Sequence, residues 1–244
     1  MLPPDTTTLR ELSRALRTAL SAFLVTIGLG YLTALALMFL VEIDPHQKAG
    51  HGVIEGIAVK YRGSPTGSRL EAALRGSMGA KLPAPERDAL LDWVRAGAAE
   101  PGYAAAQPVF ERSCVACHSA KSGMPLVPLD SYAAVRKLTG ADRGPSLAQL
   151  ARVSHVHIFG MSFIFLLTGS IFALSSGPAA FKTAVVLLPF VSIWADIGSW
   201  WVTRYDAFFA YVVFAGGALM GAALAVQIAV SLWQMWFARP PARP

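Results

Sequence analysis

The stretch TALSAFLVTIGLGYLTALALMFLV, residues 18–41, contains no charged side chain. A helix needs roughly 20 apolar residues to cross the hydrocarbon core of a bilayer, and this stretch is long enough. Three further apolar stretches follow, at about residues 154–176, 183–202 and 207–237. The sequence therefore predicts four membrane-spanning helices, with one polar insert, residues 42–153, between the first and the second.

The composition of the chain is that of a membrane protein. Of its 244 residues, 54% are hydrophobic and only 15% are charged, and the mean hydropathy is +0.47. A soluble domain has about a quarter of its residues charged. The formal net charge of +6 is better explained by arginines flanking the spans than by a nucleic-acid surface, because no basic stripe with interleaved aromatic residues occurs. We expect a lipid bilayer as a partner and no nucleic acid.

The basic residues near the spans predict the orientation. They lie before the first span, between the second and third, and after the fourth: Arg10, Arg14, Arg17, Lys182, Arg239 and Arg243. By the positive-inside rule this side is cytoplasmic, so segments 1–17 and 238–244 lie inside and the insert lies outside. The first span is favoured as an uncleaved anchor over a signal peptide, because it is long and no small-x-small site follows it.

The insert contains both cysteines of the chain, in RSCVACHS, residues 112–119. Cys114, Cys117 and His118 fit the C-x-x-C-H pattern of c-type haem attachment. Two thiols one helical turn apart can add to the two vinyl groups of a haem, and His118 can then be the proximal iron ligand. A redox C-x-x-C pair would follow a βαβ pattern and a structural zinc site would need further ligands, and neither is found. A chance match of two cysteines stays open. The sequence predicts one covalent haem c, which bacteria attach outside the cytoplasmic membrane.

The insert reads as short helices joined by loops rich in proline and glycine. The predicted helices cover residues 68–76, 84–98, 103–118 and 129–140. No useful period-2 alternation occurs, so we expect no sheet of consequence. The predicted fold class is all-α: a four-helix membrane bundle with an inserted outward-facing haem domain.

Residues 68–125 resemble the class I c-type cytochromes in rearranged order. In that family the C-x-x-C-H helix comes first, followed by a methionine loop and a closing helix. The segment RGSMGAKLPAPERDALLDWVRAGA, residues 75–98, looks like the methionine loop and closing helix, but it precedes the motif, as in a circularly permuted domain. Permutation is physically cheap where chain termini lie close together. The resemblance implies Met78 as the distal iron ligand, with Met124 as the rival and a histidine from elsewhere as a third alternative.

Four further histidines fall near the predicted outer membrane surface: His46, His51, His155 and His157. Three interpretations stay open: interfacial histidines bonded to headgroups or water, ligands of a second, non-covalent haem b, or a site for a quinone headgroup or a metal. His155 and His157 are two positions apart, about 200° around a helix, so they cannot both face the same partner.

Asp196 is the single charge within the third span. A buried charge in a membrane is costly unless it is paired or faces water, so Asp196 is a candidate functional residue. Trp194, Trp200 and Trp201 look like an interfacial belt, which places Asp196 near the surface, and we expect it to pair with Arg204 rather than to relay protons. Glycines in AGGALMGAAL, residues 215–224, predict close helix packing.

No hydrolytic constellation, phosphate loop or dinucleotide fingerprint occurs in the sequence. We therefore expect an electron-transfer subunit rather than a stand-alone enzyme, in the bacterial inner membrane, between other integral redox subunits and a soluble or membrane-bound donor or acceptor. One alternative is a quinol-oxidising cytochrome with a quinol or haem b site in its bundle. Another is a haem-based sensor or assembly factor.

Overall fold

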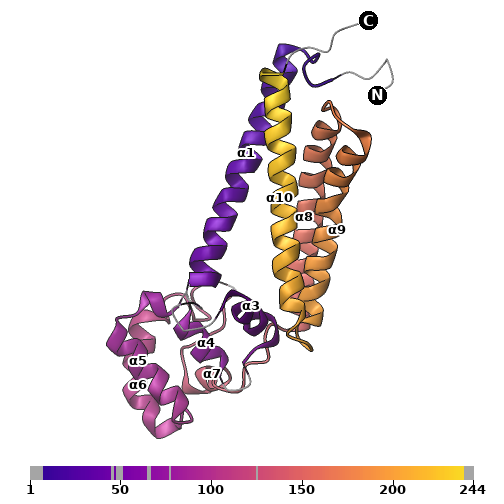
Figure 1. The fold of residues 1–244 in the computed structure, drawn as a ribbon. Coiled ribbons are helices and arrows are strands. Elements are labelled where there is room, and N and C mark those ends of the chain that lie inside the picture. The colour runs from indigo at the N-terminus through magenta and orange to yellow at the C-terminus, as the bar shows by residue number, and fades with distance from the viewer. Residues whose placement is uncertain are drawn as a thin grey trace, which may run out of the picture. The chain divides into compact units, whose positions relative to one another are not determined.

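The computed structural model describes residues 8–44, 47, 52–64, 67–76, 78–124 and 126–238. The chain divides into two compact units. The membrane unit comprises the N-terminal part up to Ala36 and the part from Leu147 onward, and the small unit is Leu37–Ser146. The described residues form helices, turns and loops, with only an isolated bridge between Ser68 and Ala141, so the fold is all-α (Figure 1).

Four long helices form the membrane unit. They are α1 (Arg14–Met38), α8 (Leu147–Ala173), α9 (Ala179–Val202) and α10 (Phe209–Trp236). Each is long and apolar enough to cross a bilayer, so the chain is a multi-pass membrane protein. Three of the helices start earlier than the predicted spans, because hydropathy marks the apolar part of a helix while its backbone bonds continue into polar residues. A π-helical turn, η1 (Phe39–Ile43), follows α1.

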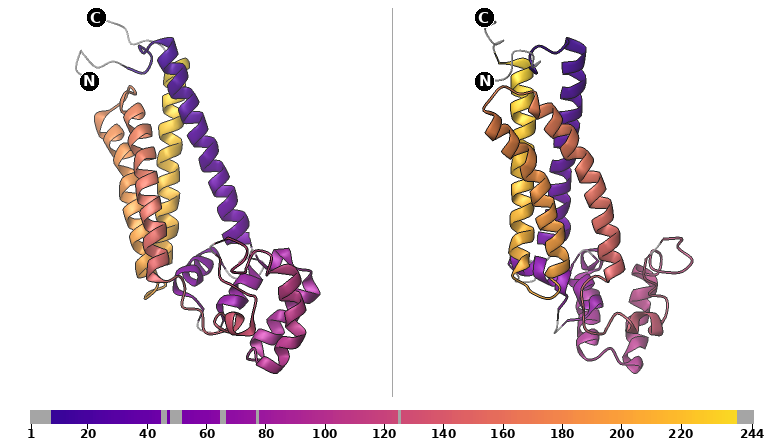
Figure 2. Two further views of the ribbon diagram at one scale, coloured as in Figure 1. Left: turned by 180° about the vertical axis from the view of Figure 1, so that it is seen from behind. Right: turned by 90° about the vertical axis from the view of Figure 1, so that its right-hand side faces the viewer.

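Helices α8, α9 and α10 pack against one another along their lengths (Figures 1 and 2). The closest approach of α9 and α10 is at Gly216, where an added Cβ would lie 3.0 Å from the Asp196 Cβ and 3.1 Å from the Ser192 carbonyl oxygen. The glycine-rich stretch of α10 thus does allow close helix packing, as the sequence predicted.

Helix α1 joins the bundle through its N-terminal end. Leu24 is its buried residue, and most of its apolar side chains are exposed. Nη1 of Arg10 and Nη1 of Arg17 donate to the carbonyl oxygen of Met235 at 2.8 and 2.9 Å, and the Arg17 guanidinium lies 5.0 Å from the ring centroid of Trp236. Cations at a helix C-terminus satisfy its last carbonyls and oppose its dipole, so these arginines cap α10.

The small unit contains short helices. They are α3 (Val53–Arg62), α4 (Arg69–Arg75), a 3₁₀ turn η2 (Gly79–Lys81), α5 (Ala84–Arg95), α6 (Glu100–Ser113) and α7 (Tyr132–Arg136). Side-chain caps fix two of the starts. The Ser68 hydroxyl accepts from the Glu71 N–H at 3.0 Å, and the Ser131 hydroxyl accepts from the Ala134 N–H at 3.3 Å. Such caps satisfy donors that the first helical turn leaves unpaired.

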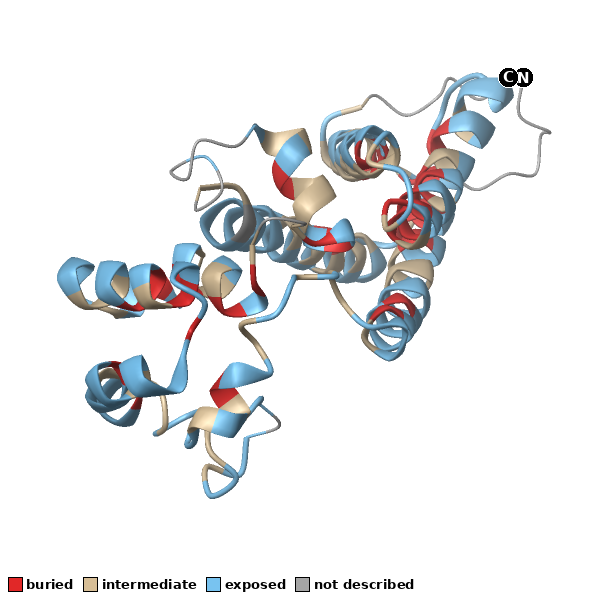
Figure 3. Ribbon diagram, turned by 90° about the horizontal axis from the view of Figure 1, so that it is seen from below, coloured by how far each residue is buried: buried red, intermediate tan, exposed pale blue. Residues whose placement is uncertain are grey.

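The core of the small unit gathers apolar side chains of α4, α5, α6 and α7. Phe110 of α6 is 1% exposed, and its ring meets Trp93 of α5 edge-on at 6.3 Å and stacks on Tyr103 at 6.0 Å. An ion pair between Arg112 and Glu86, at 2.7 Å, also joins the two helices. The helix containing Trp93 therefore packs against the helix that leads into the cysteines. Figure 3 shows the buried positions along these helices.

The small unit differs from the sequence prediction in three places. Helix α3 was not predicted, α6 ends at Ser113 rather than continuing to residue 118, and α7 covers only Tyr132–Arg136 of the predicted helix 129–140. The backbone explains the second difference. Cys114 has φ −120°, outside the helical range, and the Val115 N–H donates to Phe110, five residues back, instead of four. The cysteine motif consequently lies in turns after α6.

Candidate functional site

The two cysteines lie in the tight turn that follows α6. The Cys114 N–H still donates to the Phe110 carbonyl at 2.9 Å, as in a helix. The N–H groups of Cys117 and His118 then both donate to the Cys114 carbonyl, at 3.1 and 2.8 Å. Both thiols are free; Cys114 is half-buried and Cys117 is exposed. The turn therefore presents two unpaired thiols, with His118 directly after them.

The His118 ring is held by a backbone carbonyl nine residues further on. Its Nδ1 lies 2.9 Å from the Val127 oxygen, and the His118 carbonyl in turn accepts from the Leu129 N–H at 2.7 Å. A carbonyl oxygen can only accept, so Nδ1 is the donor, and in the neutral imidazole Nε2 keeps its lone pair. Metal-ligating histidines are commonly oriented in this way, with the second nitrogen bonded to a carbonyl. The loop thus prepares Nε2 of His118 to act as a ligand.

Between α3 and the start of α8, exposed large apolar side chains lie on two loops. Within the described part of residues 52–146, the large apolar side chains that are exposed are Met78, Met124, Leu126 and Val127. Three of them follow His118 closely in the chain, and Met78 lies in the loop between α4 and α5. Exposed apolar groups of this kind mark surfaces that a ligand or partner covers. Both loops are those that the sequence analysis assigned to haem binding.

Both candidate methionines are accessible. Met78 is 37% exposed and Met124 is 48% exposed. Met78 immediately precedes η2, whose Gly79 packs so closely on α4 that an added Cβ would collide with the Leu74 carbonyl. The loop carrying Met78 is therefore fixed at its base, whereas its thioether is open to a ligand. Met78 stays the distal candidate on the strength of the resemblance.

The histidines near the membrane divide into two groups. His46 and His51 lie outside the described residues. His155 and His157 are both exposed on α8 and contact different neighbours. The His155 ring lies 5.0 Å from that of Phe159, and the His157 ring meets Trp200 of α9 edge-on at 5.4 Å. Because the two histidines are two positions apart on a helix, their rings lie on different sides of α8.

Asp196 is buried within the bundle, with 8% of its surface exposed. Its Oδ1 accepts a hydrogen bond of 3.0 Å from the indole N–H of Trp200, one turn further along α9. Trp200 is itself buried, Trp194 is 65% exposed, and the indole N–H of Trp201 donates to the Ser154 hydroxyl at 3.1 Å. The interfacial belt of these three tryptophans stays a prediction. The pairing of Asp196 with Arg204 stays a prediction.

Sequence reasoning missed two partners at these sites. No sequence pattern could have identified the Val127 carbonyl as a partner of His118. It is a backbone group, and the sequence does not determine the path of its loop. Trp200 could have been found, since it stands four positions after Asp196 on the same face of α9. The described part of the chain contains no group of three or more His, Cys, Asp and Glu side chains placed to hold a metal ion.

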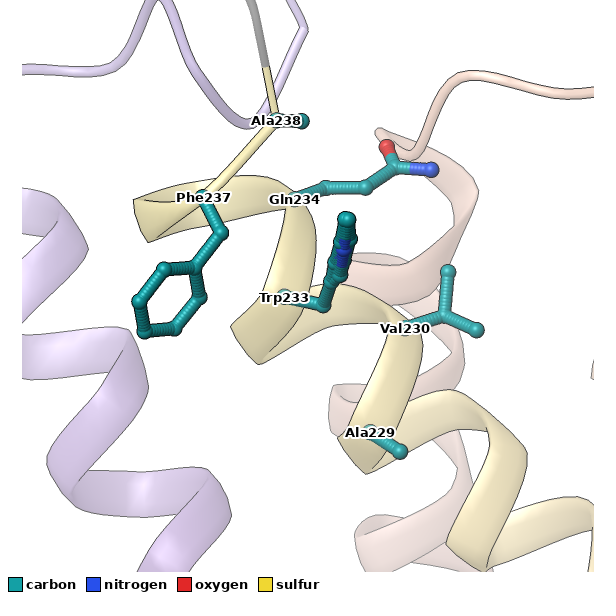
Figure 4. A pocket seen from close by; sticks show the side chains of 6 residues that line it. All are labelled: Ala229, Val230, Trp233, Gln234, Phe237 and Ala238. Atoms are coloured by element: carbon teal, nitrogen blue, oxygen red, sulfur yellow. The ribbon is translucent and has the colours of Figure 1, made fainter.

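One cavity lies at the far end of α10 from Asp196. Its volume is about 730 Å³, and the residues that line it are Ala229, Val230, Trp233, Gln234, Phe237 and Ala238 (Figure 4). The Gln234 side chain is engaged, since its amide bonds the backbone N–H and carbonyl of Ser176 at 2.6 and 2.9 Å. No titratable or metal-ligating side chain lines this cavity, so the cavity is not part of the candidate site.

Comparison with known proteins bears on the membrane unit. Residues 142–242 match the family model Aq_1264_TM, described as a transmembrane helical domain. This match covers α8, α9 and α10. No curated protein and no solved structure shows significant similarity to the chain.

Proposed function

We propose that the chain is a membrane-anchored c-type cytochrome. It relays single electrons at the periplasmic face of a bacterial inner membrane, as a subunit of a larger membrane redox complex. The observation that carries this proposal is the bond between His118 Nδ1 and the Val127 carbonyl, directly after two free cysteines in one turn. A backbone carbonyl bonded to Nδ1 is a common arrangement of metal-ligating histidines.

The residues present fit a covalent haem. The thiols of Cys114 and Cys117 would hold its vinyl carbons, and His118 would supply Nε2 to the iron. The haem would cover the exposed apolar side chains of Leu126 and Val127. Haem bound here would supply a one-electron iron couple, whose potential a thioether ligand from Met78 would raise. The two thiols are free, Met78 is exposed, and His118 is partly buried with its Nδ1 bonded to the Val127 carbonyl.

The bundle supports a role beyond anchoring. A single span would tether the small unit, yet the chain has four helices able to cross a bilayer. The exposed apolar surface of α1 and the close-packed trio of α8, α9 and α10 offer area for other integral subunits. The donor and the acceptor would then be membrane-bound or soluble redox proteins.

The test is the haem content of the purified protein. We expect the pyridine haemochrome spectrum of a c-type haem, and haem that stays on the polypeptide in denaturing gels, at one per chain. Replacing both cysteines, Cys114→Ser with Cys117→Ser, should abolish covalent haem. Replacing a polar residue of the same loop, Ser122→Ala, serves as the matched control and should leave it. Haem-free wild-type protein from cells that mature other c-type cytochromes would refute the proposal.

One observation favours the alternative of a quinol-oxidising cytochrome. His157 is fixed by a backbone carbonyl in the manner of His118, since its Nδ1 lies 2.9 Å from the Val153 oxygen. A quinol-oxidising protein should reduce its own haem when given only a quinol, whereas a pure relay should need a partner.

A further inference from the structure

An ion pair joins the start of α5 to the end of α6. Nη2 of Arg112, in the last turn of α6, donates to Oε1 of Glu86, in the first turn of α5, at 2.7 Å. An acidic side chain in a first turn and a basic side chain in a last turn are each favoured by the dipole of their own helix. The contact places the first turn of α5 beside the last turn of α6.

The two loops of the candidate haem site emerge at this end of the helix pair. The Met78 loop, residues 78–83, runs directly into α5, and the cysteine turn, residues 114–118, directly follows α6. Arg112 stands two positions before Cys114, and Glu86 stands three positions after the Met78 loop. The ion pair therefore lies between the points where the chain leaves one loop and enters the other.

The Met78 loop packs on the first turn of α5. A Cβ added to Gly79 would lie 3.1 Å from Cδ of Arg87, and the Arg87 N–H donates to the Pro83 carbonyl at 3.0 Å. Because the loop rests on this turn, a movement of the turn away from α6 would carry the loop away from the cysteine turn.

Arg112 is the cation that the structure pairs with Glu86. The Glu86 side chain is 28% exposed, and its second oxygen, Oε2, is buried without a hydrogen-bond partner among the residues that the structure describes. A buried oxygen without a partner is costly, so the carboxylate relies on the bond at Oε1. Arg112 is 59% exposed, so water screens the pair and its effect is modest.

We infer that Glu86 and Arg112 are a positioning pair for the proposed haem site. Their ion pair holds the Met78 loop and the cysteine turn at one end of the two helices, and so limits how far the Met78 thioether moves from the turn. With the loop held, an added ligand competes less well with this thioether. The inference rests on the proposed function for the use of the two loops, and it deepens that function by naming residues that control them from outside.

The test compares three variants of the full-length protein: Arg112→Gln, which breaks the pair, Arg112→Lys, which keeps the charge, and Arg95→Gln as the matched control. Arg95 also pairs across helices, with Glu71 of α4 at 3.2 Å, but at the opposite end of α5. The measurements are amide hydrogen exchange of residues 78–82 and the affinity of the ferric haem for added imidazole. We expect Arg112→Gln to speed the exchange and to tighten imidazole binding, each about threefold, the loss suited to a partly exposed ion pair.

The other variants should behave as the wild type does. Unchanged imidazole affinity in Arg112→Gln, even with faster exchange, would overturn the inference, because the pair would then only stabilise the fold. Equal changes in Arg95→Gln, or no rescue in Arg112→Lys, would overturn it as well. In a Met78→Leu background, Arg112→Gln should change the affinity no further, and a further change would place the effect away from Met78.

The two proposals fail separately. Protein without covalent haem would disprove the cytochrome, and the exchange alone would then decide whether the pair holds the Met78 loop. Haem-bearing protein whose imidazole affinity does not depend on Arg112 would keep the cytochrome and disprove the positioning pair.

Discussion

At the scale of single residues, His118 and His157 share one device. Each has Nδ1 at 2.9 Å from a backbone carbonyl, that of Val127 or of Val153, and each therefore presents Nε2. The two carbonyls differ in origin. Val153 is four residues back on the same helix, whereas Val127 belongs to a loop that folds over the motif. In the small unit a loop supplies the carbonyl that orients His118, because this histidine lies beyond the end of α6.

The thiol of Cys114 should react more slowly than that of Cys117 in the haem-free chain. Burial raises the pKa of Cys114 above its ordinary value of 9.0, so its reactive thiolate forms only at higher pH. Alkylation by iodoacetamide can be followed in Cys117→Ser, which keeps only Cys114, and in Cys114→Ser. We expect the rate profile of Cys114 to reach its midpoint above pH 9. In urea the two variants should react alike; a difference that persists there would contradict the assignment to burial.

The identity of the distal ligand can be tested with two matched leucine variants of the haem-loaded protein. Met78→Leu should lose the sulfur-to-iron absorption band and lower the midpoint potential, because a thioether ligand raises the potential. Met124→Leu should keep both. The opposite pattern would assign Met124, and retention of the band in both variants would exclude both assignments.

At the scale of helices, the N-terminal end of α1 is held to the C-terminal end of α10. Arg10 and Arg17 cap the last turn of α10, and Leu9 and Leu24 pack in a cluster with Met235. Further along, α1 has little buried surface. This helix is therefore available to lipid or to another subunit over most of its length.

Helix packing within the bundle should depend on Gly216 and not on its neighbour. Gly216→Val would place side-chain atoms against Asp196 and Ser192, whereas an added Cβ at Gly217 meets nothing within 4 Å. We expect Gly216→Val to cost about 1–3 kcal/mol and to lower the melting temperature in detergent. Gly217→Val carries the same change in helix propensity and should melt as the wild type does. Equal destabilisation of both variants would show that the close contact at Gly216 is not responsible.

At the scale of the whole molecule, we predict that the small unit lies on the opposite side of the membrane from the segments before α1 and after α10. The basis of this prediction is the cations before the first span, between the second and third spans, and after the fourth span, by the positive-inside rule. Alkaline phosphatase, which is active only outside the cytoplasm, should be active when fused after Gly140 and inactive when fused after Ala238. A fusion after Gly177, between α8 and α9, should also be inactive. Activity after Ala238 would reverse the orientation and remove the haem motif from the compartment where haem c is attached.

The sequence by itself determined the four long helices, the all-α class and the C-x-x-C-H motif. Hydropathy and short spacings are local, and backbone bonding in an apolar medium leaves a helix as the simplest solution for such segments. Met78 also came from the sequence, but only through a resemblance. Whether a haem is bound stays a prediction.

Only the tertiary structure decided how the side chains at these sites are partnered. It ended α6 before Cys114, brought the Val127 carbonyl to His118, and buried Trp200 against Asp196. These contacts depend on where a loop returns and on which face of α9 meets its neighbours. Such choices follow from the packing of many side chains at once, because no local pattern records which distant carbonyl or ring a side chain will meet.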